Sequence, residues 1–434
     1  MGIRRSWSLR SCDEYLAAAM SLHDAGRFPE ALSLYDQART LCAGSPAFWN
    51  NRGNTLLELN RLGDAAESYG AALALCPTLA DTRVALATCL QGLGRVDEAL
   101  SECDTVLAAH PGHAEAHWNR GLLLLLTGNY EKGWEEYEWR WKKRRFTSPR
   151  RQFGVPQWEG EAISGRRILI HAEQGFGDTI QFARYLPRIA GQGAEVIFEC
   201  HPPLVSLVGS LPGGIRVVPF GHPLPPFDLH CPLLSLPRIF GTTLATVPSQ
   251  VPYLFEPADK RQFWGSILPV TPGLKVGLCW KGKPYPDPGR SCPTDALAAL
   301  GRVPGVEFSS LQMDEEHTRL PFPCDGFAPL LLDFGDTAAL IGRLDLVITI
   351  DTAVAHLAGA LGRETWVMLP SAPDWRWGRQ GSTTPWYPNV WLFRQEGMDG
   401  WESLVRKVSD ALAQWCAVRG SVPASDAGSG RWLR

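Results

Sequence analysis

The sequence predicts a protein of two parts: a stack of paired helices, then two α/β halves built on parallel sheets. Three observations predict this class. A pattern of residue sizes repeats through the first third with a period of about 34 residues. Short apolar runs then alternate with segments of helical spacing between residues 152 and 420. A Pro-rich stretch with many turn signals, Pro219–Pro257, leads into the second α/β half.

The composition is that of an ordinary soluble globular chain. Its 434 residues include 42 basic and 45 acidic side chains, and the formal net charge of −3 gives no general case for nucleic-acid binding. The longest apolar run, Leu122–Leu126, is far short of the roughly 20 residues of a membrane span. The N-terminal arginines precede no continuous apolar core, so we expect no secretory signal and a cytoplasmic location. We expect the 11 cysteines to be reduced and mostly buried.

The repeated positions carry small residues where two antiparallel helices must approach closely, and bulky residues where neighbouring helices leave a groove. Proline then ends the second helix of a unit. Two successive units show the frame: Trp49, Gly53, Leu56, Ala65, Tyr69, Ala72 and Pro77, then Arg83, Ala87, Leu90, Ala99, Cys103, Val106 and Pro111. This is the tetratricopeptide pattern, and about four units span residues 12–147. Such a stack has a concave face that holds an extended segment of another protein, or else serves packing and dimerisation.

A basic run with interleaved aromatic residues, Trp139–Arg151, closes the repeats. Such a run is compatible with a nucleic-acid or phosphate patch. We favour a solvated last helix whose tryptophans pack on the next domain, because the total charge of the chain is balanced.

Apolar runs bounded by glycine and turn residues predict the strands of the α/β region. The expected strands are Arg166–Ala172, Ala194–Cys200, Ile215–Phe220, Leu274–Trp280, Glu307–Gln312 and Leu344–Ile350. The expected domains are an N-terminal half over 155–260 and a C-terminal half over 270–418, and residues 421–434 are expected to form a flexible tail.

Two turns contain candidate functional residues. Gln174, Gly175 and Gly177 lie in a strand-to-helix loop that ends at Asp178, and Thr179–Ala190 has helical spacing. Asp178 either serves a reaction or simply caps the helix, as aspartate often does.

The second turn, Asp351–His356, also follows a strong strand. Backbone amides at a helix start bind phosphate oxygens, and the small side chains of Thr352 and Ala353, followed by Val354, leave room for that approach. His356 either faces the ligand or is a core histidine beneath Trp366.

These two tracts, Glu173–Pro187 and Asp351–Gly362, resemble glycosyltransferase family 9, which contains the ADP-heptose:lipopolysaccharide heptosyltransferases. Val276–Trp280, Pro373–Trp377 and Trp386–Pro388 look like its bacterial branch with N-terminal tetratricopeptide repeats. The resemblance covers about residues 155–415. It implies a GT-B fold, two Rossmann-like domains in which the N-terminal half holds the acceptor and the C-terminal half holds the nucleotide-sugar donor.

The resemblance also implies roles for single residues. Asp178 would be the general base of an inverting transfer. The amides after Asp351 and a cation from Lys281, Lys283 or Arg290, with Arg290 ranked first, would stabilise the leaving nucleoside diphosphate without a metal or other cofactor. For the acidic residue that binds the ribose, the candidates are Asp314, Glu315 and Glu316.

Three hypotheses follow. The first is an inverting, metal-independent glycosyltransferase whose repeats present a protein acceptor, such as a surface or flagellar protein. The second is the same chemistry on a lipopolysaccharide or other glycan acceptor. The third is a non-catalytic scaffold that keeps the fold. The sequence identifies neither the sugar, the nucleotide nor the oligomeric state.

Overall fold

The computed structural model describes residues 10–144, 146, 148–268, 273–283, 288–313, 319–396 and 400–419. The chain forms two compact units. One comprises Met1–Thr127 with Lys132–Phe146, and the other comprises Gly128–Glu131 with Thr147–Arg434. In the described residues no helix is both long enough and apolar enough to cross a membrane.

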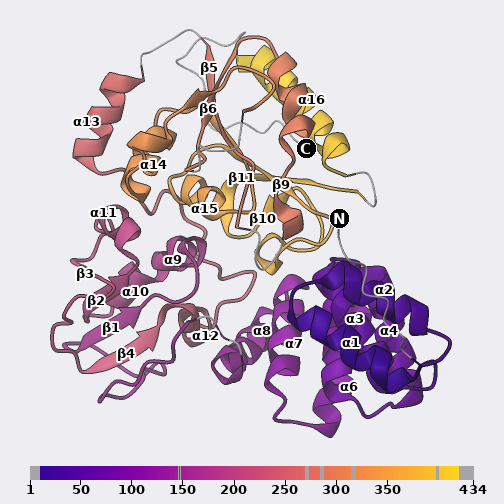
Figure 1. Ribbon diagram of the computed structural model, residues 1–434. Helices are drawn as coiled ribbons and strands as arrows, with labels where there is room; N and C mark the ends of the chain where they lie inside the picture. The colour runs from indigo at the N-terminus through magenta and orange to yellow at the C-terminus, as the bar shows by residue number, and fades with distance from the viewer. Residues whose placement is uncertain are drawn as a thin grey trace. The chain divides into compact units, whose positions relative to one another are not determined.

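The first unit consists of helices that pair as antiparallel hairpins (Figure 1). They are α1 (Cys12–Asp24), α2 (Phe28–Ala38), α3 (Pro46–Glu58), α4 (Leu62–Leu75), α5 (Ala80–Gly92), α6 (Val96–Ala109), α7 (Ala114–Leu126) and α8 (Tyr130–Tyr137), whose first two residues belong to the second unit. The tight turns inside the first three hairpins place Gly26, Asn60 and Gly94 at φ values of 71°, 55° and 73°. Glycine and asparagine adopt this left-handed conformation most easily, so the turn chemistry repeats with the period of the sequence.

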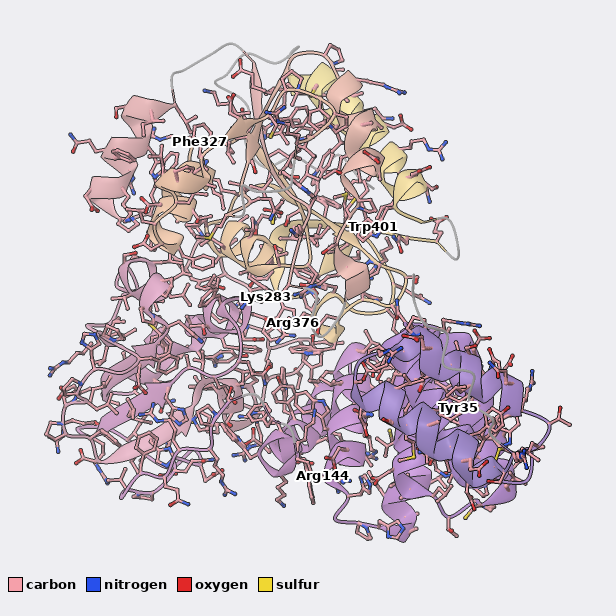
Figure 2. The ribbon with its side chains drawn as sticks, viewed as in Figure 1. Tyr35, Arg144, Lys283, Phe327, Arg376 and Trp401 are labelled. Atoms are coloured by element: carbon pink, nitrogen blue, oxygen red, sulfur yellow. A yellow bond between two sulfur atoms is a disulfide. The ribbon has the colours of Figure 1, made fainter. Side chains whose placement is uncertain are left out.

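Close helix approach explains the small residues of the repeat. A Cβ added at Gly53 would lie 2.5 Å from the Tyr69 ring, and Ala65 is fully buried beside that ring. Tyr35, at the position equivalent to Tyr69, is buried in the first hairpin (Figure 2). The first helices of successive hairpins also pack on one another, α1 on α3, α3 on α5 and α5 on α7. The predicted helical stack is therefore confirmed.

The prediction of reduced thiols throughout is wrong for one pair, because Cys12 and Cys42 form a disulfide. Cys12 begins α1 and Cys42 follows α2, and the hairpin brings their Cα atoms to 5.3 Å across a sequence separation of 30. That proximity depends on tertiary packing, which cysteine spacing alone does not reveal. The other cysteines are free thiols, and most of them are buried.

The basic run Trp139–Arg151 is occupied by contacts within the protein. The Trp139 ring stacks on His117 with centroids 3.7 Å apart, and the Lys142 ammonium lies 3.7 Å from the Trp139 centroid. The Arg144 guanidinium binds Asp81 at 3.1 Å. The expectation that the tryptophans pack on the next domain is wrong for Trp139, because the stacking partner comes from α7 of the same unit. Arg145 and Thr147 lie outside the described residues.

The second unit contains two parallel sheets (Figure 1). The first has the order β3-β2-β1-β4, with β1 (Arg167–His171), β2 (Glu195–Cys200), β3 (Arg216–Pro219) and β4 (Leu229–Pro232). Its helices are α9 (Phe176–Phe182), α10 (Leu186–Ala190), α11 (Val205–Val208) and α12 (Leu236–Ile239). The three strands predicted here are confirmed. The fourth lies inside the stretch expected to be turns, because a four-residue strand beside prolines has no readable periodicity.

The second sheet has the order β10-β11-β9-β8-β5-β6-β7, and among its described strands only the β10–β11 pair is antiparallel. Its strands are β5 (Leu274–Cys279), β6 (Val306–Ser310), β7 (Asp325–Gly326), β8 (Leu346–Ile350), β9 (Thr365–Leu369), β10 (Thr383–Thr384) and β11 (Tyr387–Arg394). The accompanying helices are α13 (Ala258–Ile267), α14 (Phe334–Ile341), α15 (Ala353–Ala360) and α16 (Gly400–Arg419). One core joins Val276, Ile348 and Trp366 of the sheet to Val405 and Val408 of α16.

Both sheets contain a point at which the strand order reverses. In the first sheet β2 and β3 lie on one side of β1, and β4 lies on the other. In the second, β6 and β7 lie on one side of β5, and β8 lies on the other. Open α/β sheets bind ligands at the carboxyl ends of the strands beside such a reversal. The loops after β1, β5 and β8 hold the candidate residues singled out in the sequence.

Candidate functional site

The loop after β1 is held in a fixed conformation. Gln174 has a φ of 59°, and its backbone N–H donates to Ser148 Oγ at 2.8 Å. The Gly175 N–H donates to Asp178 Oδ2 at 2.9 Å, in the first turn of α9. The capping interpretation of Asp178 is therefore correct as far as this oxygen is concerned.

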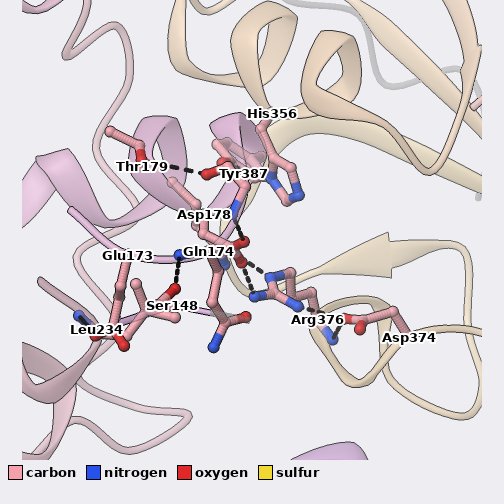
Figure 3. A network of polar contacts seen from close by, with 12 residues as sticks. Ser148, Glu173, Gln174, Asp178, Thr179, Leu234, His356, Asp374, Arg376 and Tyr387 are labelled. Atoms are coloured by element: carbon pink, nitrogen blue, oxygen red, sulfur yellow. Dashed lines mark hydrogen bonds and ion pairs between the residues drawn. The ribbon is translucent and has the colours of Figure 1, made fainter. Parts of the chain in front are cut away.

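The other carboxylate oxygen of Asp178 has a different partner. Asp178 Oδ1 accepts a hydrogen bond from Arg376 Nη2 and forms an ion pair with it (Figure 3). Arg376 belongs to the loop that follows β9, in a 3₁₀ turn over Trp375–Trp377. Its Nε donates to Gln181 Oε1 at 2.7 Å and its Nη1 donates to Asp374 Oδ1 at 2.9 Å. The two halves of the α/β unit thus meet at this carboxylate.

The two predicted turns also meet directly. A Cβ added at Gly177 would lie 2.9 Å from His356 Cδ2 and 3.5 Å from Ala353 Cα. Helices α9 and α15 pack against each other along this contact (Figure 1). Only glycine leaves room for so close an approach, which explains the residue type at position 177. The structure therefore brings the glycine loop of the first half onto the start of α15 in the second half.

The start of α15 is built from small residues. Thr352 is the N-cap and makes no side-chain capping bond, and its hydroxyl lies 3.3 Å from that of Thr349. Ala353 is partly exposed, and Val354 is buried.

Asp351 has a raised pKa. Burial, together with the nearby carboxylate of Asp374, raises the pKa of Asp351 to about 6, against the opposing charges of Arg376 and Arg290. The Asp351 carboxyl group therefore takes up a proton within reach of neutral pH.

His356 is a buried histidine with a hydrogen-bond partner. It is only 4% exposed, its Nδ1 lies 3.0 Å from the Tyr387 hydroxyl, and its ring stacks on Trp377 at 5.2 Å. Of the two alternatives, the buried histidine is the one observed, but the ring above it is Trp377 and not Trp366, because the loop after β9 folds back over α15. Burial and the charges of Arg376 and Arg184 hold the pKa of His356 well below its usual value. The imidazole is therefore neutral at pH 7.

The candidate cations lie in the loop after β5. Lys281 and Lys283 are exposed, and the Lys283 ammonium lies 5.8 Å from the ring centroid of Phe176 in the glycine loop (Figure 2). Arg290 Nη2 donates to the Lys283 carbonyl at 3.0 Å. Arg290 Nε is buried and has no hydrogen-bond acceptor among the described residues. A guanidinium with a spare donor suits an anionic ligand.

Gln312 fixes the start of this loop. Its carboxamide oxygen accepts the backbone N–H groups of Trp280 at 2.9 Å and Lys281 at 2.8 Å. The sequence gives no sign of this role for Gln312, because a glutamine after a strand carries no recognisable pattern. The neighbouring ribose candidates Asp314, Glu315 and Glu316 lie outside the described residues.

Asp374, Arg376 and Gln181 were also not assigned roles from the sequence. The signal that the sequence offers for Asp374 and Arg376 is the family resemblance of the tract Pro373–Trp377. Within the described part of the chain, no group of three or more His, Cys, Asp or Glu side chains could hold a metal ion.

Comparisons with known proteins identify the repeats. Two tetratricopeptide-repeat family profiles match residues 16–80 and 56–124. The inactive TPR repeat-containing thioredoxin TTL3 of Arabidopsis thaliana is 35% identical over 78 residues, which cover 18% of this chain and 11% of that protein. A crystal structure of MamA aligns over 29% of this chain and 74% of its own, with 18% identity and a TM-score of 0.28.

One relative extends beyond the repeats. Protein FlbA of Caulobacter vibrioides is 28% identical over 437 aligned positions, which cover 92% of this chain and 72% of FlbA. The chain thus carries tetratricopeptide repeats in its N-terminal region, followed by an α/β region with parallel strands, and it is similar to FlbA along most of its length.

Proposed function

We propose that this protein is an inverting, metal-independent glycosyltransferase of the GT-B type, which uses a nucleotide-sugar donor. The observation that carries the proposal is the contact of Gly177 with Ala353 and His356. It joins the two turns that lie at the strand-order reversals of separate sheets. Ligands bind at such reversals, and two of them facing one another suit a reaction between two substrates.

The donor half offers groups for a diphosphate. Backbone amides at the start of α15 and the helix dipole favour phosphate oxygens. Arg290, with its spare Nε donor, lies close enough to Asp351 for their charges to interact, and Lys283 adds a positive charge beside Phe176 in the first half. Together these groups would stabilise the negative charge that develops on the leaving nucleoside diphosphate.

The acceptor half offers a base. In the proposed step an acceptor hydroxyl oxygen forms a bond to the anomeric carbon of the sugar. The bond from that carbon to the diphosphate oxygen breaks, and its electron pair leaves with the nucleoside diphosphate. Asp178 accepts the hydroxyl proton. Because attack and departure occur on opposite faces of the carbon, the anomeric configuration inverts.

The acceptor we propose is a protein segment presented by the repeats. Stacked helical hairpins of this kind bind extended segments of other proteins on their inner surface, and here the first helices of successive hairpins, α1, α3, α5 and α7, pack in a row. If the enzyme transferred sugar to a small glycan at the same rate as to a protein, the repeats would not be needed to present the acceptor, and a glycan acceptor would be indicated.

One observation favours a second candidate, a scaffold without turnover. Both carboxylate oxygens of Asp178 already have partners, the Gly175 N–H and the Arg376 guanidinium. A carboxylate has about four lone-pair sites, so two partners leave room for a hydroxyl proton. Turnover measurements decide between the two candidates.

The test is a panel of nucleotide sugars incubated with the wild-type protein and with Asp178→Asn. We expect nucleoside diphosphate release and sugar transfer from one donor, and a loss of about 10²–10⁴-fold in kcat for the variant because the base is gone. Asp259→Asn is the matched control, since Asp259 also lies in the first turn of a helix, α13, which contains none of the candidate residues. Equal rates for all three proteins, or no turnover in a folded wild type, would refute the proposal.

A further inference from the structure

We propose that Arg376 is the positioning residue of this site, which orients the Asp178 carboxylate toward the acceptor hydroxyl. The inference rests on the transferase function proposed above and deepens it. It assigns a role to a loop of the donor half in preparing the base of the acceptor half.

The contacts of the guanidinium carry the inference. Each nitrogen of Arg376 has a different partner: Nε donates to Gln181, Nη1 to Asp374 and Nη2 to Asp178 (Figure 3). Gln181 and Asp178 lie one turn apart on α9, whereas Asp374 precedes Arg376 in its own loop. The planar group is therefore fixed on one side by its own loop, and on the other it binds two neighbouring side chains of α9.

The arrangement requires arginine, and not lysine, at position 376. The Arg376 side chain is 10% exposed and that of Asp178 is 16% exposed, so the pair is mostly buried but still reaches solvent. The guanidinium carbon also lies 4.4 Å from the Trp375 ring centroid. Lysine has a single donor centre and cannot bind three partners in one plane. A lysine at position 376 would keep the charge and lose the orientation.

The two hydrogen bonds to Asp178 determine which lone pairs of its carboxylate remain available to an acceptor proton. Oδ2 accepts the Gly175 N–H and Oδ1 accepts Arg376, and these two bonds fix the rotation of the carboxylate. The remaining lone pairs then have fixed directions for an acceptor proton. A misplacement of about 1 Å in such a group can cost about 10²-fold in rate. The expected effect of losing Arg376 is therefore on the chemical step rather than on donor binding.

The chain offers a matched control for a merely structural role. Arg394 supports the same loop, because its guanidinium donates to the carbonyls of Trp377, Gly378 and Gly381. Among the described residues, its hydrogen bonds go to backbone carbonyls of that loop and not to Asp178. A general weakening of the loop would therefore appear in Arg394→Gln, whereas a loss of carboxylate orientation would appear only at position 376.

The test measures kcat and donor KM for wild type, Arg376→Lys, Arg376→Gln and Arg394→Gln with the donor that turns over. We expect kcat to fall about 10²-fold in both Arg376 variants while KM changes less than about threefold, and Arg394→Gln to keep the wild-type kcat. Arg376→Lys covers the case in which Arg376→Gln fails to fold.

A second arm does not depend on turnover. The unfolding midpoints of Asp178→Asn, Arg376→Gln and the double variant report whether the pair exists in solution, and we expect the double variant to unfold no lower than Arg376→Gln alone. Additive losses, or an Arg394→Gln kcat as low as that of Arg376→Gln, would overturn the positioning role while wild-type turnover upheld the transferase. Absence of wild-type turnover would instead refute the transferase, and the positioning role with it.

Discussion

At the scale of single residues, burial drives two neighbouring groups toward the uncharged form. Burial holds the pKa of His356 well below 6.5, whereas burial with Asp374 raises the pKa of Asp351 to about 6. Their contributions to stability depend on pH in opposite directions. The unfolded chain protonates His356 below pH 6.5 while the folded chain does not, so the His356 term destabilises as the pH falls. The folded chain binds a proton on Asp351 between pH 4 and 6, so that term loses stability as the pH rises.

We therefore predict that His356→Gln makes the free energy of unfolding depend less on pH in the acidic range. Between pH 7.5 and 5.5 the wild type should lose roughly 1.4 kcal/mol of unfolding free energy more than the variant, because one pKa unit corresponds to about that energy. Denaturant unfolding at the two pH values measures the difference, with the exposed His222→Gln as control. A pH dependence of the variant equal to that of the wild type would show that His356 titrates normally in the folded protein.

At the scale of elements, the packing of α9 on α15 depends on the missing side chain of Gly177. Helix propensity alone favours alanine over glycine in the first turn by up to about 1 kcal/mol. However, a Cβ added at Gly177 would lie 2.9 Å from the His356 ring, which Tyr387 and Trp377 hold in place. This contact predicts that alanine destabilises the protein. A Cβ can fit only if a buried ring moves.

Gly177→Ala should consequently destabilise the α/β unit by about 1–3 kcal/mol, the usual result of overpacking a tight core. Denaturant unfolding measures the change, and Gly154→Ala is the control, since a Cβ added at Gly154 meets no atom within 4 Å. If Gly177→Ala proved as stable as the control or more stable, the close contact between the two turns would not exist in solution.

The elements that the sequence predicts are those with a continuous apolar run. Strands β1, β2, β5 and β8 have such runs, and the structure has them within a residue or two of the expected bounds. The helical segment Thr179–Ala190 was predicted as one element, but the chain forms α9, a 3₁₀ turn over Ala183–Tyr185 and then α10, with Pro187 in the first turn of α10. Strand β4 could not be read because it is four residues long and ends in proline.

At the scale of the whole molecule, the sequence predicts which loops matter but not how they pair. Asp178, Asp351 and His356 stand out because each follows a readable strand. Arg376 does not, because its partner Asp178 is 198 residues away and the contact exists only once both sheets have formed. The disulfide of Cys12 with Cys42 was missed for the same reason. Local patterns therefore predict elements, and long-range contacts complete the site.

Ligand-dependent thermal unfolding tests for a nucleotide-sugar site at the start of α15. Nucleoside diphosphates and nucleotide sugars are titrated against wild type, Arg290→Ala and the exposed control Arg302→Ala. At 100 times its dissociation constant, one nucleotide class should stabilise the wild type and the control by about 2.7 kcal/mol, and Arg290→Ala much less. If no nucleotide raised the unfolding temperature of the folded wild type, the transferase account would be contradicted in favour of the scaffold.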